Sequence, residues 1–352
     1  MSESLDRYDR HQSYDDNYQH APSPVNVDVT PVPGVWRFCD LPVDSPLGIP
    51  AGPLLNGAWV MYYASLGFDV LTYKTVRSGH RECYPLPNLQ PVDCGQLTGE
   101  PPVLSAIDRM QGSWAVSFGM PSKSPDVWRG DIEQTRGSLP SGKLLSVSVV
   151  GTIQDGWNIE DLAKDYAQCA RWAVESGADC IESNFSCPNV STCDGQLYQD
   201  YASARLVAQH VREAAGGTPY LIKIGHVHRR EDAEKLLDAV GDVADALAMT
   251  NSVATTVRAA DGEMLFDGQR RGICGQATRE ASIKQVRMFA ELIAERDLAL
   301  ALVGVGGAST ADHVRAYLSA GAQAVHIATA AMIRPEVGLD IRRALAGPAG
   351  TP

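Results

Sequence analysis

The sequence predicts a single α/β fold, a (β/α)8 (TIM) barrel, from three observations. Eight short apolar runs alternate with longer stretches of helical spacing over most of the 352 residues. Three of the helical stretches end in SLGFD, ESGAD or SAGAQ, where a glycine suits the helix end and a strand follows at once. The turn after the first run, GPLLNG, lacks the GxGxxG pattern of a doubly wound dinucleotide-binding sheet, so a closed parallel barrel is favoured.

The eight apolar runs are the candidate strands, and they cover residues 48–52, 69–74, 144–150, 179–184, 220–224, 244–250, 298–305 and 323–328. Helical spacing fills most of the intervals, for example 159–176 and 281–295. Residues 75–143 break this alternation and are dense in Pro, Gly, Ser and charge. They predict a long insertion after the second strand, at the face where barrels build active sites.

The remaining part of the chain is polar at its beginning. Residues 1–34 are rich in Asp, Tyr, Ser, Asn and Pro, which predicts a disordered or loosely packed extension before a barrel domain over 35–348. The extension holds no apolar run of the kind found in a signal peptide, and no stretch approaches the roughly 18 apolar residues of a membrane span. We therefore expect a soluble, cytoplasmic protein.

Charge and cysteine usage narrow the classes of partner. The net charge of −12 disfavours nucleic acid and anionic membranes, although a local pocket can still be cationic. The 8 cysteines form no CxxC pair, which is typical of reduced thiols rather than of disulfides or a metal cluster. His226 and His228 lack a third ligand nearby, so no metal is expected.

Candidate functional residues lie where the predicted strands end, because barrel strands present active-site groups at their carboxyl ends. Lys74 and Lys223 each close an apolar strand, LTYK and YLIK, and two such lysines favour a functional role over simple solvation. Gly306 and Gly307 follow the seventh strand in GVGGAST and open a helix. This arrangement lets backbone N–H groups approach a phosphate.

The segment ESNFSCPN, residues 182–189, is the most informative. It places Cys187 in a polar turn at the end of the fourth strand, between Asn184 and Asn189. Cys169 and Cys180 instead belong to a helical stretch and a strand, where buried structural thiols are found. A thiol in a polar turn at this rim suits proton exchange.

NFSCPN closely resembles the NLSCPN signature of the class 1 dihydroorotate dehydrogenases, which the pyrimidine-binding barrel of dihydropyrimidine dehydrogenase shares in related form. LTYKT, YLIKIG, TNSV, RGICGQ, GVGG and IATA follow in the family's order, so the resemblance covers about residues 40–345. It implies an FMN-dependent oxidoreductase acting on a CH–CH donor, which oxidises dihydroorotate to orotate in pyrimidine biosynthesis.

The resemblance also implies residue roles. Cys187 corresponds to the base that takes the C5 proton, Lys223 to the lysine beside the flavin N1–C2 edge, and Lys74 to the lysine touching both FMN and substrate. The implied cofactor residues are Ala51, Gly52, Lys74, Thr75, Asn184, Lys223, Thr250, Gly275, Gly306, Gly307, Ala328 and Thr329. The implied substrate residues are Lys74, Ser117, Gly119, Met120, Asn184, Asn189, Asn251 and Ser252.

The chain departs from the family pattern at the substrate loop. VSFGMPS stands where the family has a segment such as NSMGLPN, so Val116 replaces an asparagine and removes hydrogen bonds to the substrate. A flavin barrel acting on another dihydropyrimidine or cyclic amide therefore stays open, as does a non-catalytic flavin-binding paralogue. A tRNA dihydrouridine synthase is disfavoured by the acidic surface. For the enzyme we expect a homodimer that passes electrons to a soluble acceptor or to a separate electron-transfer subunit.

Overall fold

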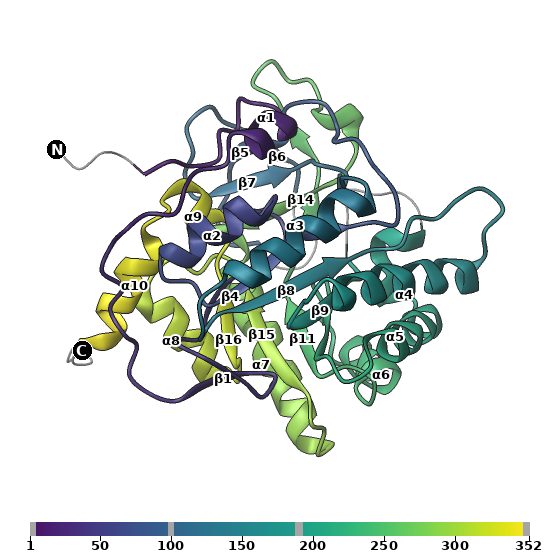
Figure 1. Ribbon diagram of the computed structural model, residues 1–352. Coiled ribbons are helices and arrows are strands. Elements are labelled where there is room, and N and C mark those ends of the chain that lie inside the picture. Colours follow the sequence, from purple (N-terminus) through teal and green to yellow (C-terminus); the bar gives the residue numbers. More distant parts are fainter. Residues whose placement is uncertain (1–4, 98–101, 187–192, 348–352) are drawn as a thin grey trace.

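A closed barrel of eight parallel strands forms the centre of the computed structural model, which describes residues 5–97, 102–186 and 193–347 (Figure 1). Around the barrel the strands follow the order β10-β11-β15-β16-β3-β4-β8-β9. Each of the eight predicted runs overlaps one of them, with β3 beginning one residue earlier and β4 ending two residues later than predicted, so the predicted barrel is confirmed. Their bounds are β3 Leu47–Ile49, β4 Val70–Val76, β8 Leu144–Val149, β9 Cys180–Asn184, β10 Tyr220–Lys223, β11 Ala246–Met249, β15 Ala301–Val305 and β16 Ala324–His326.

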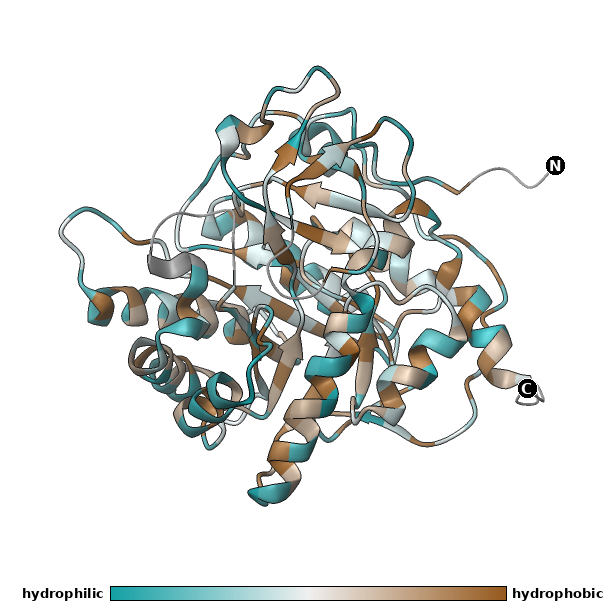
Figure 2. Ribbon diagram, turned by 180° about the vertical axis from the view of Figure 1, so that it is seen from behind, coloured by the Kyte–Doolittle hydropathy of each residue, from teal (hydrophilic) through white to brown (hydrophobic). Residues whose placement is uncertain are grey.

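Helices surround the barrel and connect its strands. They are α2 Gly57–Ser65, α3 Pro125–Ser138, α4 Ile159–Glu175, α5 Tyr201–Ala215, α6 Arg230–Val240, α7 Arg279–Glu295, α8 Ala311–Ser319, α9 Thr329–Ile333 and α10 Val337–Ala346. Polar and apolar stretches alternate along the outer helices, as expected where one face packs on the strands (Figure 2). None of the helices in the described ranges is long and apolar enough to cross a membrane.

A hairpin closes the amino end of the barrel. Its strands, β1 (Trp36–Phe38) and β2 (Leu41–Val43), are joined by Cys39 and Asp40, whose φ angles of 44° and 64° suit a tight two-residue hairpin turn. Phe38 is fully buried among apolar side chains of the barrel strands and stacks on His326, with 5.9 Å between ring centroids. The hairpin therefore seals the end opposite to the predicted site.

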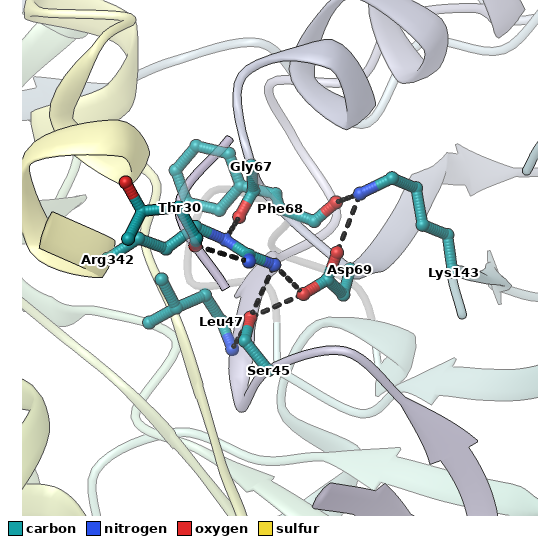
Figure 3. A network of polar contacts seen from close by, with 8 residues as sticks. All are labelled: Thr30, Ser45, Leu47, Gly67, Phe68, Asp69, Lys143 and Arg342. Carbon is teal, nitrogen blue, oxygen red and sulfur yellow. Dashed lines mark hydrogen bonds and ion pairs between the residues drawn. The ribbon is translucent and has the colours of Figure 1, made fainter. Parts of the chain in front are cut away.

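A buried polar network ties the last helix to this same end (Figure 3). Arg342 of α10 donates to the Gly67 carbonyl at 2.7 Å and to the Thr30 carbonyl at 3.1 Å, and it pairs with Asp69. Asp69 also pairs with Lys143 at 2.6 Å. The network therefore joins the N-terminal segment, the start of β4 and the C-terminal helix.

The carboxyl end of the barrel carries a second, six-stranded sheet in the order β12-β14-β7-β5-β6-β13. The insertion after β4 supplies β5 (Leu89–Asp93), β6 (Leu104–Ala106) and β7 (Ser113–Val116). The connection after β11 supplies β12 (Val253–Thr255), β13 (Val257–Arg258) and β14 (Arg271–Gly275). The insertion after β4 was predicted from the sequence as residues 75–143, but its last part forms α3, which is one of the helices around the barrel. The insertion after β11 was not predicted.

The N-terminal segment, residues 5–34, packs against the barrel. It contains α1 (Tyr14–Gln19) and buries Tyr8, Tyr14 and Val32. The indole Nε1 of Trp59 in α2 donates to the Asn17 carbonyl at 2.9 Å, and the Tyr62 hydroxyl donates to the Asp6 carbonyl at 2.6 Å. The prediction of a disordered or loosely packed extension is therefore wrong for residues 5–34, because aromatic side chains and these bonds dock the segment.

Candidate active site

A cavity of about 460 Å³ opens at the carboxyl ends of the barrel strands. The ends of β3, β10, β11, β15 and β16 form its floor and sides, and the inserted sheet covers it with Leu89, Trp114, Val116 and Phe118. Backbone and small side chains therefore face an apolar wall across this space. A flat aromatic ligand with a polar tail suits such a surface.

The cavity gathers nine of the twelve residues that the sequence implied for the cofactor. These are Ala51, Gly52, Lys223, Thr250, Gly275, Gly306, Gly307, Ala328 and Thr329. They come from five barrel strand ends and from β14, so sequence positions more than 270 residues apart meet here. Asn251, implied for the substrate, lines the same cavity.

Glycine is required where two of these connections cross. Gly307 has a φ of +62°, and a Cβ there would lie 2.6 Å from the Gly275 carbonyl oxygen. Gly275 has a φ of +102°, and its Cβ would lie 2.2 Å from the Gly112 carbonyl oxygen. A larger residue at either position would force the backbone apart and would reshape the cavity wall.

Lys223 lies between the cavity and a buried polar layer inside the barrel. Its Nζ donates to the Ala51 carbonyl at 3.3 Å. Below it, Glu182 of β9 is buried, and burial raises the pKa of its carboxyl group while Lys223 and Ser148 oppose the rise. Burial, assisted by Lys223, lowers the pKa of His326 to about 3. Lys223 is thus a cation at the cavity whose charge is felt by both groups.

Lys74, Thr75 and Asn184, the other three implied cofactor residues, do not line this cavity. Lys74 and Thr75 line a separate, much smaller void together with Tyr14 of the N-terminal segment. The Thr75 hydroxyl lies 3.0 Å from the Ser148 hydroxyl. Asn184 accepts from the Ser186 N–H at 3.1 Å and contacts Met120 Sδ at 3.6 Å.

The implied substrate residues surround these groups from two loops. The Ser117 hydroxyl accepts from Arg271 Nε at 2.8 Å, and Gly119 lies against the ring of Tyr84. Met120 has a positive φ of 53°. Asn251 donates to the Ser186 carbonyl, and Ser252 is buried without lining the cavity. Cys187 and Asn189 lie outside the described residues.

Several cavity residues were missed by reasoning from the sequence. Trp114 and Phe118 come from the insertion, Cys274 and Gln276 from β14 and the turn after it, and Arg334 follows α9. Burial raises the pKa of the Cys274 thiol to about 11, against the effect of Lys223. The run of β-branched residues at 253–257 is the signal that could have indicated the second insertion.

Among the residues that the structure describes, no three His, Cys, Asp or Glu side chains are grouped so that they could hold a metal ion. The His226 and His228 rings lie 5.8 Å apart, and burial, followed by the charge of His228, lowers the pKa of His226. Taken together, the barrel, the glycine crossings and the lysine at the strand ends are features of a barrel enzyme with its site at the carboxyl ends of the strands.

Comparison with known proteins gives the family. The family model described as dihydroorotate dehydrogenase matches residues 107–346. The dihydroorotate dehydrogenase of Dictyostelium discoideum is 30% identical, over 94% of this chain and 95% of the relative. The chain therefore belongs to the dihydroorotate dehydrogenase family and is an oxidoreductase of that type, and the family implies a flavin.

Other relatives differ in the electron acceptor that their names give. A dihydroorotate dehydrogenase (quinone) of Ralstonia nicotianae is 26% identical over 86% of this chain and 83% of its own length. The catalytic subunit of an NAD(+)-type dihydroorotate dehydrogenase B of Oceanobacillus iheyensis is 30% identical, over 46% of this chain and 52% of that one. The crystal structure of the Eimeria tenella enzyme in complex with ferulenol shares the fold, with a TM-score of 0.71 at 18% identity, covering 92% of this chain and 86% of that one.

Proposed function

We propose that this protein is an FMN-dependent dihydroorotate dehydrogenase of the class 1 type, with Cys187 as its base. The observation that carries the proposal is the gathering of nine implied cofactor residues around one cavity, from widely separated parts of the chain. Its substrate would be dihydroorotate and its product orotate, in pyrimidine biosynthesis. The proposal includes a homodimer in the cytoplasm that passes electrons to a soluble acceptor or a separate electron-transfer subunit.

The residues present fit FMN. Because Gly275 and Gly307 have no side chains, their backbone lines the cavity directly. Arg334 adds a cation to the cavity wall. Lys223 would hold the pyrimidine edge of the ring system, where a cation stabilises the negative charge that develops on reduction. Bound FMN would supply the acceptor for the C6 hydride of the substrate.

The chain itself would move the proton. Cys187 Sγ, as the thiolate, would take the proton from C5 of dihydroorotate, and the electrons of that C–H bond would form the new C5–C6 double bond as the C6 hydride leaves. Asn184 and Asn251 would orient the ring through its alternating donors and acceptors. Lys74 would meet the substrate from the side of the N-terminal segment.

Anaerobic reduction tests this proposal. Dihydroorotate is mixed with the purified protein and the flavin band near 450 nm is followed, with Cys187→Ser and Cys187→Ala measured alongside. We expect rapid bleaching by the wild type and slowing of about a hundredfold or more in both variants, which is typical of losing a general base. Equal bleaching rates in wild type and variants would refute the role of Cys187. Reoxidation by fumarate, NAD+ or a short-chain quinone then identifies the acceptor.

A second candidate is a flavin barrel that acts on another dihydropyrimidine or cyclic amide, and the apolar cavity wall favours it. Val116 and Phe118 line the cavity, and Val116 occupies the position at which the family pattern has an asparagine. A substrate with fewer polar groups than dihydroorotate would leave fewer hydrogen bonds unmade against this apolar wall. Bleaching by dihydrouracil but not by dihydroorotate would support this candidate over the first.

A further inference from the structure

Glu182 carries a buried carboxyl group inside the barrel. Its side chain is 1% exposed, and β9 presents it on the same face as Cys180, which belongs to the apolar cluster in the barrel interior. Within the described ranges, Glu182 Oε1 has no hydrogen-bond partner. An ionised carboxylate at such a depth is strongly destabilised unless an opposite charge compensates it. The surroundings of Glu182 therefore decide whether this group is charged.

The strand register places Glu182 beside Lys223. Glu182 of β9 pairs with Leu221 of β10, and Lys223 follows Leu221 by two residues, so all three side chains point to the same face of the sheet. With about 4.8 Å between strands and about 3.3 Å per residue, the Cα atoms of Glu182 and Lys223 are roughly 8 Å apart. Lys223 is 3% exposed and lines the cavity, whereas Glu182 does not line it. Two buried groups of opposite charge thus share the barrel interior, and of the two the lysine meets the cavity.

The groups around Glu182 favour its ionised form. Burial raises the pKa of the Glu182 carboxyl group, but the charge of Lys223 and a hydrogen bond from Ser148, its register partner on β8, hold this pKa down. His326 of β16 also feels the charge of Lys223, and burial, assisted by that charge, lowers the pKa of His326 to about 3. The His326 ring is therefore neutral at neutral pH, and the negative charge beside Lys223 comes from Glu182.

Thr72 provides an uncharged counterpart in the same interior. It follows Val70, a member of the same apolar cluster, by two residues on β4, so its side chain also points into the barrel. The side chain is 1% exposed, and its Oγ1 has no hydrogen-bond partner among the described residues. Replacement of Thr72 by valine would change the polarity of the barrel interior without changing its charge.

We infer that Glu182 is the buried counter-ion of Lys223, a positioning residue that moderates the positive charge presented to the cofactor and thereby lowers the flavin midpoint potential. The inference rests on the proposed function, in which Lys223 meets the pyrimidine edge of the flavin. Glu182 acts through Lys223 and takes no part in the bond changes. A lower potential makes the reduced cofactor a stronger electron donor to the acceptor that follows.

The test is the flavin midpoint potential of the FMN-loaded protein, measured by stepwise anaerobic reduction against a redox dye of known potential. Glu182→Gln removes the charge and keeps the shape of the side chain. One unit charge acting over about 10 Å, at an effective dielectric constant of about 20, changes an equilibrium about tenfold. We therefore expect the ratio of reduced to oxidised flavin at a given potential to rise about tenfold, which is about 30 mV for a two-electron couple. Thr72→Val is the matched control and should change this ratio less than about twofold, because it removes no charge.

The infrared spectrum of the FMN-loaded wild type gives a second readout that needs no variant. A buried carboxylic acid has a C=O band at a higher frequency than a carboxylate, and this band should be absent at neutral pH if Glu182 is ionised. Equal potentials in wild type and Glu182→Gln, an equal shift in Thr72→Val, or a band of a buried carboxylic acid in the wild type would overturn the inference and leave the proposed function standing. A protein that takes up no FMN would overturn the proposed function and the inference with it.

Discussion

Replacement of Arg342 by Met tests the buried network at the amino end of the barrel. The guanidinium donates to two backbone carbonyls, to the Ser45 hydroxyl and to Asp69, whose side chain is fully buried (Figure 3). Removing one partner of a buried ion pair costs about 3–5 kcal/mol, because the other charge is left without its match. Lys143 still pairs with Asp69, so we expect the lower end of that range, about 3 kcal/mol.

The assay is urea unfolding of the FMN-loaded protein, and the matched control is Arg343→Met at the next position. Arg343 pairs with Asp340, but its side chain is 59% exposed, so its loss should cost about 1 kcal/mol or less. Because the network lies far from the cavity, both variants should keep their flavin spectrum. Arg342→Met with a stability within about 1 kcal/mol of Arg343→Met would refute the reasoning.

Three further predictions concern pH, the cofactor and the substrate. Burial lowers the pKa of His326 to about 3 from 6.5, so unfolding takes up a proton below about pH 6.5 and stability should fall by up to about 1.4 kcal/mol per pH unit between pH 6.5 and 3. In His326→Leu the free energy of unfolding, measured by urea titration at pH 7 and pH 5, should fall less between the two pH values than in the wild type. An equal fall in both proteins would contradict the role of His326. Gly307→Ala should lose FMN, which is measured by the ratio of absorbance at 450 and 280 nm. Gly79→Ala is the control and should keep FMN, because a Cβ there meets open space. Full FMN content in both variants would contradict the requirement for glycine at position 307. Val116→Asn restores a polar group to the cavity wall and should tighten orotate binding about fivefold, as one net hydrogen bond would, whereas weaker binding would point to the second candidate substrate.

The barrel was predictable from the sequence because its strands have a local pattern, a short apolar run, that follows from their position in the core. The eight barrel strands are short apolar runs, and parallel strands buried on both faces show this pattern wherever they occur. Lys223 ends one such strand and Gly306 and Gly307 follow another, so their meeting at one end of the barrel could be predicted from the order of elements alone.

The parts that the sequence did not predict depend on pairing across long separations. β14 pairs with β7, residue Gly272 with Val116, and no local pattern indicates a partner so distant in the chain. The N-terminal segment has the composition of a disordered tail, yet Tyr8 and Tyr14 are buried because rings and lysines from α2, the insertion and β4 receive them. Composition counts polar residues but does not show which side chains will find a partner.

The measurement that tests the central claim most directly is the absorbance spectrum of the purified protein, before and after anaerobic addition of dihydroorotate. The account predicts bound FMN with a band near 450 nm that dihydroorotate bleaches, and release of FMN on denaturation. A protein that binds no flavin even after incubation with FMN would contradict the assigned cavity. A flavin band that dihydroorotate leaves unchanged would contradict the proposed substrate.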